Sequence, residues 1–363
     1  MSRTKLFLLL LIALVPLSCA LPSLFSQALS VSVKPSDPIL VLAPANATAT
    51  PTPFMPLPPT PTYIPTSFPT PTVAPTGTPD IPVPITKSWA DYPGPSVWPD
   101  FDIPAPVGLL PQPNGQVNIL LLGSDQRLNE GGFRTDTILL LTINRAMSTA
   151  NLTSFPRDLY VNIPGYTMQR INTAMAHGGF DSLALTFEYN FGVHPDHYFL
   201  INFWSFSQAI DSLGGIDVHV AVPFTDQRDR YGDYHVPAGN VHMDGATALW
   251  YVRARYSTND FDRGRRQQEV LMASFERLLS LDAIQKAPQL FDIYRQNVTT
   301  DMTFDQMAPF IPLAAQLSDT SRIHHYYISP REVYDWVTTT GAMVLIPIRD
   351  AVLAVMHQAL NIP

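Results

Sequence analysis

Proline is distributed very unevenly along this chain of 363 residues. Of its 36 prolines, 25 lie before Asn114, and only 11 lie in the 250 residues that follow. Proline lacks a backbone N–H and fixes φ, so the first part of the chain cannot form a sheet or a long helix. The sequence therefore predicts one folded domain over residues 114–363, long enough to bury a full core.

The first 25 residues have the layout of a signal peptide or a membrane anchor. Arg3 and Lys5 precede an uncharged apolar run over residues 6–25, which is just long enough to span a bilayer. A small residue precedes Cys19, as in the cleavage sites of bacterial lipoproteins. Lipidation at Cys19 or an uncleaved signal anchor would hold the domain at the outer face of the cytoplasmic membrane. Release after cleavage is the third possibility, and all three predict an extracytoplasmic domain.

The segment over residues 26–113 is expected to be a disordered, Pro/Thr-rich linker. It contains the run PTPFMPLPPTPTYIPTSFPTPTVAPTGTPD, and no charged residue occurs between Pro38 and Pro79. Such a composition favours an extended, semi-rigid spacer. A ligand for proline-binding modules is the alternative, and export of the chain disfavours it.

The charge balance excludes a general nucleic-acid binder, because the formal net charge is −8 and the pI is about 5.5. One stretch is rich in positive charge although the whole chain is acidic. It covers residues 253–267, RARYSTNDFDRGRRQ, and carries five arginines. Crowded arginines repel one another unless an anion holds them, and their planar forks suit phosphate. The spacing of Arg253 and Arg255 predicts extended backbone. We interpret the stretch as half of a phosphate site, and a solvated, salt-bridged helix start is the alternative.

Asp260 is expected to cap a helix that carries part of this cluster. Arg263, Arg266 and Gln267 then fall at i, i+3 and i+4 and share one face of the helix. Arg265 is expected to point elsewhere.

Two aspartates flank a loop between two predicted strands. Asp125 follows the apolar run over residues 117–122, and Asp136 precedes the run over residues 137–144. If these strands are neighbours, the two carboxylates lie near each other at the ends of the loop. Such a pair shares a proton or holds a cation, and Mg²⁺ is the ion that also bridges to phosphate oxygens. The alternative is that Asp125 only caps a turn.

Strands separated by helices of about ten residues predict a layered α/β domain. Arg157 lies in a bend between two strands, a common place for functional side chains. Arg170 begins a helical stretch, and residues 225–239 are expected to form a surface flap. Strands are expected over residues 117–122, 137–144, 152–155, 159–163, 197–202, 216–220 and 323–328, and helices over residues 170–179, 181–191, 203–213, 245–252, 263–281, 282–296, 303–317 and 348–360.

Several motifs occur in an order that resembles the LytR-CpsA-Psr family. They are LLLGSDQR, RTDTILL, SFPRDLYVNIPG, RINTAMAHGG, HYFLINF, DSLGGIDV and ALWYVRARYSTNDFDRGRRQ. The resemblance implies a three-layer α/β/α sandwich with a central mixed sheet. It also implies a membrane-anchored bacterial enzyme that moves a glycopolymer from a polyprenyl pyrophosphate carrier onto peptidoglycan, at the C6 hydroxyl of N-acetylmuramic acid.

The resemblance also implies roles for individual residues. Asp125 and Asp136 match the magnesium-binding aspartates, and Asp260 matches the aspartate that accompanies the arginines. Arg170 stands where lysine is commoner in the family. The implied pyrophosphate-binding set is Arg134, Arg157, Arg170, Arg253, Arg255, Arg263, Arg266 and Gln267.

The chemistry of the transfer explains why such residues are needed. Negative charge develops on the bridging oxygen as polyprenyl phosphate leaves, and Arg157 and Arg263 would stabilise it. Asp260 or Asp136 would take the proton of the acceptor hydroxyl. Two other functions remain open: a polyprenyl pyrophosphatase, in which water is the acceptor, and a non-catalytic wall-binding or regulatory protein.

Overall fold

The computed structural model describes residues 87–99, 101–126, 133–280 and 298–360. The predicted membrane anchor, most of the predicted linker and the helix expected over residues 282–296 lie outside these ranges. Within them, no helix combines the length and the apolar composition that crossing a membrane requires.

A six-stranded mixed sheet forms the centre of the fold, with the strand order β11-β6-β1-β2-β3-β12. β1 pairs in parallel with β6, and β3 with β12, whereas the β1–β2, β2–β3 and β6–β11 pairs are antiparallel. Four strands therefore run in the same direction: β1, β3, β6 and β12. Their C-terminal ends lie along the same end of the sheet, here called the site edge. The strands span Gln116–Ser124 (β1), Thr135–Asn144 (β2), Thr149–Ser154 (β3), His197–Asn202 (β6), Val298–Thr300 (β11) and Ile323–Tyr327 (β12).

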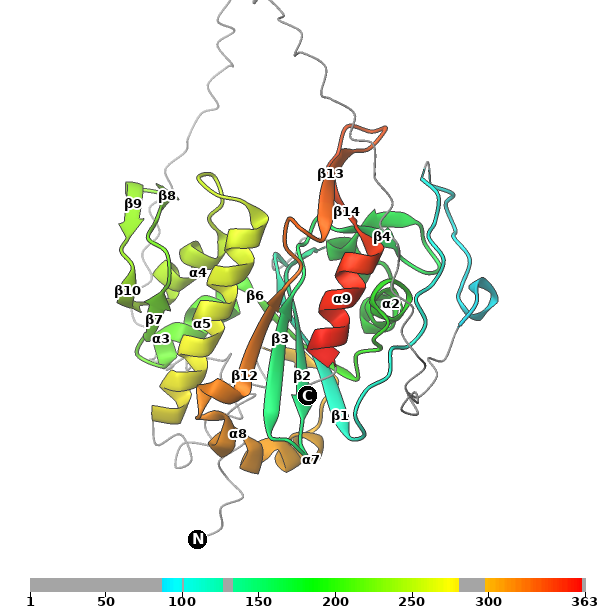
Figure 1. Ribbon diagram of the computed structural model, residues 1–363. Coiled ribbons are helices and arrows are strands. Elements are labelled where there is room, and N and C mark those ends of the chain that lie inside the picture. Colours follow the sequence, from blue (N-terminus) through cyan, green and yellow to red (C-terminus); the bar gives the residue numbers. More distant parts are fainter. Residues whose placement is uncertain (1–86, 100, 127–132, 281–297, 361–363) are drawn as a thin grey trace, which may run out of the picture. The chain divides into compact units, whose positions relative to one another are not determined.

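Helices cover both faces of this sheet (Figure 1). Side chains alternate along β1, so that Ile119 and Leu121 contribute to one core and Leu120 and Leu122 to the other. The first core includes side chains of α5, α7 and α8, and the second includes side chains of α2 and α9. The predicted three-layer α/β/α sandwich with a central mixed sheet is confirmed. The helices span Ala174–Phe191 (α2), Phe203–Ser212 (α3), Gly245–Arg253 (α4), Asp260–Ser280 (α5), Phe304–Met307 (α7), Ile311–Leu317 (α8) and Arg349–Leu360 (α9).

A third core lies where α3, α4 and α5 pack against a small sheet of β7 and β10. β7 spans Ile216–Val220 and β10 spans Gly239–Met243. The neighbouring hairpin consists of β8 (Phe224–Arg228) and β9 (Gly232–Val236). The prediction of a surface flap over residues 225–239 was therefore wrong. Exposed polar side chains of the hairpin alternate with Phe224, Asp226 and Val236, which are buried, and this period is that of a half-buried strand.

The segment that leads into α2 also differs from the prediction. Arg170 is the last residue of β5 (Met168–Arg170), which pairs with β4 (Tyr160–Asn162), and a 3₁₀ turn follows. The glycines expected to stop a helix instead kink α2, since Gly179 has φ 66° and ψ −155°. Near the C-terminus, β13 (Val333–Val337) and β14 (Met343–Pro347) form a further hairpin. The helix expected over residues 303–317 is interrupted by a 3₁₀ turn between α7 and α8.

The described part of residues 87–113, here called the N-terminal strap, packs on α2. The N–H of Val107 donates to the carbonyl of Tyr189 at 2.9 Å, and the N–H of Leu110 donates to the carbonyl of Gly192 at 2.8 Å. Leu110 is buried. The folded domain thus begins before the predicted boundary at Asn114, because a proline-rich segment can pack in an extended form without belonging to a sheet.

Candidate functional site

A small pocket opens at the site edge, where β2 begins, β3 ends and α5 begins. The carboxyl ends of strands in α/β folds commonly meet at ligand sites, because the connecting loops gather there. The pocket is lined by both charged and apolar side chains. Its lining consists of Asp136, Ser154, Phe155, Pro156, Asp260, Phe261, Arg263, Gly264, Gln267 and Ile328.

Arg157, which follows β3, is the centre of the charged network beside this pocket. Its Nη1 donates to Oδ1 of Asp136 at 2.7 Å, and its Nε lies 3.4 Å from Oδ2 of Asp158. Its backbone N–H donates to Oδ2 of Asp260 at 3.3 Å. Burial lowers the pKa of Arg157, but these carboxylates, Asp136 above all, outweigh it and leave the pKa raised. The guanidinium is therefore a permanent cation beside the pocket.

Asp260 and Arg263 form the second half of the network at the start of α5. Nη2 of Arg263 lies 2.7 Å from Oδ1 of Asp260 and donates to the backbone carbonyl of Asp136 at 3.3 Å. Burial raises the pKa of Asp260, against the opposing effect of Arg263. Burial also lowers the pKa of Arg263. Both groups are thus held in a poorly hydrated position, where electrostatic interactions are strong.

Oδ1 of Asp260 is buried and has no well-directed hydrogen bond among the described residues. Its contact with Arg263 is close, but the N–H does not point at the oxygen. A buried carboxylate oxygen without a hydrogen bond is costly, and it can accept a proton or a donor from a ligand. This oxygen belongs to a residue that lines the pocket.

Asp158 is a member of the network that sequence reasoning missed. It lies close to Arg157, and its Oδ1 forms an ion pair with Nε of Arg170 at 3.2 Å. Nη2 of Arg170 donates to the carbonyl of Met343 in β14 at 2.6 Å. Arg170 thus joins the network through Asp158 and ties it to the β13–β14 hairpin. The adjacency of Asp158 to Arg157 in the sequence was the available signal.

Asp125 and Arg134 form a clasp at the two ends of the β1–β2 loop. The N–H of Arg134 donates to Oδ1 of Asp125 at 2.6 Å, its Nη2 lies 3.1 Å from Oδ2, and the N–H of Asp125 donates to the carbonyl of Arg134 at 3.1 Å. Arg134 is mostly exposed and does not line the pocket. The strand pairing places Ser124 opposite Thr135, so Asp125 and Asp136 lie on adjacent strands at the site edge.

These two carboxylates are each held by one arginine, which leaves further oxygen lone pairs available. The hydroxyl of Ser124 is buried, with no hydrogen-bond partner among the described residues. An all-oxygen set of this kind suits a hard cation such as Mg²⁺, which keeps several waters and binds one or two carboxylates. In the part of the chain that the structure describes, no three His, Cys, Asp or Glu side chains are grouped closely enough to hold a metal ion by themselves.

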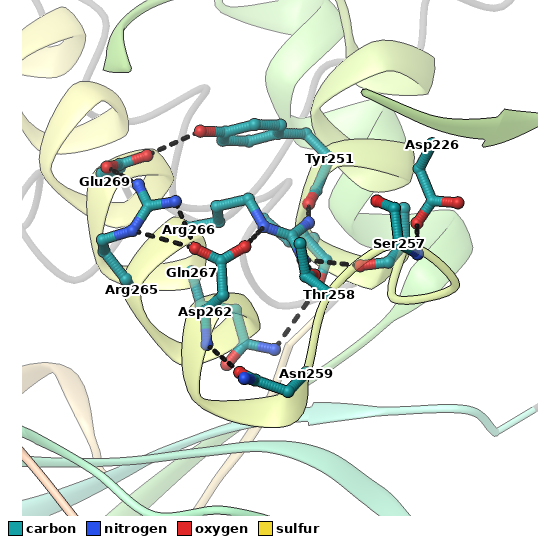
Figure 2. A network of polar contacts seen from close by, with 12 residues as sticks. Asp226, Tyr251, Ser257, Thr258, Asn259, Asp262, Arg265, Arg266, Gln267 and Glu269 are labelled. Atoms are coloured by element: carbon teal, nitrogen blue, oxygen red, sulfur yellow. Dashed lines mark hydrogen bonds and ion pairs between the residues drawn. The ribbon is translucent and has the colours of Figure 1, made fainter. Parts of the chain in front are cut away.

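Two residues that were predicted to share one helix face point in different directions. Gln267 lines the pocket with Arg263, as expected, whereas Arg266 is 0% exposed and points toward α4. Figure 2 shows the guanidinium of Arg266 between the carbonyl of Tyr251 in α4 and the carboxylate of Asp262. Its Nη2 donates to the carbonyl of Ala254 at 2.6 Å, and its Nη1 donates to the carbonyl of Tyr251. Arg266 thus holds the loop.

The remaining arginines of the cluster lie around this loop. Arg265 points away from the pocket, as expected, and pairs with Asp262 and Glu269. Arg253 is the last residue of α4, so the predicted extended backbone begins only at Ala254. Arg255 is exposed, and its charge helps to lower the pKa of Arg263, after the larger effect of burial.

The motif order and this geometry agree with a comparison to known families. The model of the LytR_cpsA_psr family matches residues 98–352. The chain belongs to this family. Among curated LytR-CpsA-Psr relatives, "Polyisoprenyl-teichoic acid--peptidoglycan teichoic acid transferase TagU" of Oceanobacillus iheyensis is 38% identical over 199 residues, which is 53% of this chain and 60% of the relative. TagT of Bacillus subtilis, named as the same kind of transferase, is 33% identical over 226 residues, 60% of this chain and 70% of the relative.

Solved structures of LytR-CpsA-Psr proteins share the fold. The structure described as "TagT bound to LIIa-WTA" has a TM-score of 0.55 and 27% identity, covering 68% of this chain and 91% of TagT. B. subtilis TagV has a TM-score of 0.57 and 25% identity, covering 68% of this chain and 97% of TagV. The sequence alignments span about three fifths of the first curated relatives.

Proposed function

We propose that the chain transfers a glycopolymer from a polyprenyl pyrophosphate carrier to peptidoglycan, at the C6 hydroxyl of N-acetylmuramic acid. One observation carries this proposal: Arg157 and Arg263 approach one small pocket together with Asp136 and Asp260. Cationic forks and buried carboxylates in one place suit a pyrophosphate diester and an attacking hydroxyl. The names of the curated relatives describe transfer of the same kind.

In the proposed reaction, the acceptor hydroxyl attacks the phosphorus that carries the glycan. A new P–O bond forms, the bond from that phosphorus to the bridging oxygen breaks, and polyprenyl phosphate leaves with the electron pair. Arg157 and Arg263 stabilise the charge that develops on the bridging oxygen, and Gln267 contributes a neutral donor at the pocket. Arginines in such positions contribute about 10³ to 10⁵ in the rate of phosphoryl transfer.

Asp260 is the proposed acceptor of the hydroxyl proton. Its pKa is raised by burial, which brings its basicity closer to the pH at which the reaction runs. Its Oδ1 has no well-directed hydrogen bond among the described residues, so it can receive that proton. Asp136 is the less favoured base, because Arg157 already donates to its carboxylate.

Asp125 and Asp136 would hold Mg²⁺ in this proposal, with the hydroxyl of Ser124 nearby in the sequence. The ion would supply additional positive charge to the pyrophosphate oxygens. When pyrophosphate and ion are bound, Arg134 and Arg157 would have to share these carboxylates or turn toward phosphate.

The apolar side chains of the pocket suit the start of a prenyl chain. Phe155 and Ile328 belong to the core between the sheet and helices α2 and α9, and Phe261 packs against it. A prenyl group bonded to the pyrophosphate would therefore contact apolar side chains directly. The charged side chains of the pocket would hold the two phosphates.

We propose that the domain works outside the cytoplasm, tethered by the N-terminus to the outer face of the cytoplasmic membrane. The support is the cationic and apolar pattern of residues 1–25 and the long spacer that follows. Mass spectrometry of the mature N-terminus separates the possibilities. A diacylated Cys19 identifies a lipoprotein, an intact Met1 identifies a signal anchor, and an unmodified internal terminus contradicts anchoring.

A single assay separates the three candidate functions. Purified protein is incubated with Mg²⁺ and a labelled prenyl pyrophosphate glycan, with and without peptidoglycan. Label on peptidoglycan together with free prenyl phosphate is the expected result. Release of prenyl phosphate at the same rate without acceptor would identify a pyrophosphatase, and binding without any release would identify a non-catalytic protein.

A further inference from the structure

Two exposed aromatic side chains, one at the start of α3 and one in the α4–α5 loop, are here called the rim, and the proposed chemistry does not use them. Trp204 is 64% exposed and Tyr256 is 88% exposed. Neither ring stacks on another ring or on a cation among the described residues. Burying a large aromatic ring is favourable, so two rings kept in water beside a site indicate a binding surface.

Trp204 lies at the site edge. It is the second residue of α3, which follows β6 directly, and Asn202 at the end of β6 pairs with Ser124 at the end of β1. The centroid of the ring of the preceding residue, Phe203, lies 4.1 Å from the guanidinium carbon of Arg253. The start of α3 is thus in contact with the end of α4, from which the arginine-bearing loop departs.

Tyr256 lies in that loop, between Arg255 and the start of α5. Arg255 is exposed and forms no ion pair with the described residues. Asp260, which lines the pocket, follows four residues after Tyr256. The loop that carries Arg255 and Tyr256 therefore leads into the start of α5, which lines the pocket.

The loop backbone is fixed although its side chains are exposed (Figure 2). The N–H of Ser257 donates to Oδ2 of Asp226 in β8 at 3.3 Å. From the other side, Arg266 binds the carbonyls of Tyr251 and Ala254. A ring held on fixed backbone loses little conformational freedom on binding, which favours affinity.

We propose that Trp204 and Tyr256 bind the sugar residues next to the pyrophosphate of the glycopolymer donor. The flat rings stack on the apolar faces of the sugars, and Arg255 complements phosphates farther along the polymer. The inference rests on the proposed function, because only a donor held by its pyrophosphate in the pocket must extend its first sugars over this rim. The acceptor has no such covalent link to the pocket.

The test uses two soluble probes and the whole 363-residue chain. One probe is farnesyl pyrophosphate, and the other is farnesyl pyrophosphate with a disaccharide on its terminal phosphate. Calorimetry should show that the wild type binds the disaccharide probe about tenfold more tightly, which is the order of an aromatic stacking contact. Trp204→Ala and Tyr256→Ala should each lose most of this preference and keep their affinity for farnesyl pyrophosphate.

Trp98→Ala is the matched control, because Trp98 is 80% exposed but belongs to the N-terminal strap. It should keep the full preference. The inference is overturned if the wild type binds both probes equally, if the two rim variants keep the preference, or if they change only the KM for peptidoglycan. Failure of farnesyl pyrophosphate itself to bind the wild type would instead overturn the proposed function.

Discussion

The protonation of Asp260 should control turnover. Burial raises its pKa, so a base at this position becomes active at a higher pH than an ordinary aspartate, whose pKa is about 4. We expect kcat to rise with pH through this raised pKa. Asp260→Asn should lower kcat by about 10² to 10⁴ and remove this limb of the pH profile. Steady-state rates between pH 4 and about 9 measure both effects.

Thermal melts of Asp260→Asn at each pH provide the control, since the variant must stay folded for its rates to be interpreted. An Asn variant that is slow but keeps the wild-type acid limb would assign the proton transfer to another group. Asp136 would then be the next candidate.

Asp125 and Asp136 should together determine the response to magnesium. Addition of Mg²⁺ should raise the Tm of the wild type, because an ion that binds only the native state stabilises it. Asp136→Ala and Asp125→Ala should lose this rise and the dependence of turnover on Mg²⁺. Differential scanning calorimetry with Mg²⁺ and with chelator measures the shift. Full activity of Asp136→Ala in chelator would contradict the metal site.

Several residues of the site could be predicted from the sequence and others could not. Arg157, Asp260 and Arg263 lie together beside one pocket, and their role in binding phosphate stays a prediction. Asp158 was missed because its position next to Arg157 in the sequence does not reveal that its carboxylate also pairs with Arg170. Arg266 follows the predicted period along α5, but a partner on α4 decides where its long side chain points.

At the scale of elements, α5 has two functions along its first turns. Arg263 and Gln267 face the pocket, whereas Arg266 faces α4 and the loop between the helices. The centroid of the Phe224 ring lies 4.0 Å from the guanidinium carbon of Arg266. Phe224, the first residue of β8, thus shields this guanidinium from solvent. Burial lowers the pKa of Arg266. The buried cation therefore depends on the loop carbonyls and on Asp262.

Arg266→Met should destabilise the fold more than it weakens phosphate binding. It removes a buried donor and leaves Oδ2 of Asp262 and two carbonyls without their partner, which costs about 2 to 4 kcal/mol in the free energy of unfolding. Arg265→Met is the control, because its partners are partly exposed and its loss should cost no more than about 1 kcal/mol. Urea denaturation measures both. Equal effects would show that Arg266 does not hold the loop.

At the scale of the whole molecule, one buried carboxylate helps to fix the N-terminal strap to α2. Glu188 accepts the hydroxyl of Tyr92 at 3.0 Å and the ring Nδ1 of His194 at 2.7 Å, and it pairs with Lys87. Burial raises the pKa of Glu188, but these contacts outweigh it and leave the pKa lowered. Part of the attachment of the strap is therefore a charge that exists only above the folded-state pKa.

The contribution of Glu188 to stability should depend on pH. A lowered folded-state pKa means that the stabilisation is present above the ordinary pKa of 4.5 and is lost as the pH falls through the lowered value. Glu188→Gln should lower the free energy of unfolding by about 2 kcal/mol at neutral pH and flatten its acid dependence. Asp217→Asn, at an exposed pair with His242, is the control. Melts from pH 7 to about 3 measure both.

The layered α/β architecture was predictable because apolar strands and amphipathic helices alternate along the chain. The start of the domain could not be predicted in the same way. A high proline content indicates that a segment cannot join a sheet, but such a segment can still pack against the folded domain. Tyr92 and Leu110 are buried although they lie in the proline-rich part. Of the small sheets on the side of α4, β7 was predicted as a strand, whereas β8 and β9 escaped prediction because each of these polar strands has only five residues.

The last turn of α9 lies at the opposite end of β1 from the pocket. The carbonyl of Leu360 accepts Nε2 of Gln116, the first residue of β1, and the nine residues of that strand span about 30 Å before Ser124. A biotin acceptor peptide or fluorescent reporter joined to α9 would therefore stand well clear of incoming glycan. Sensor chips or beads loaded by that terminus should present the reactive end to solution.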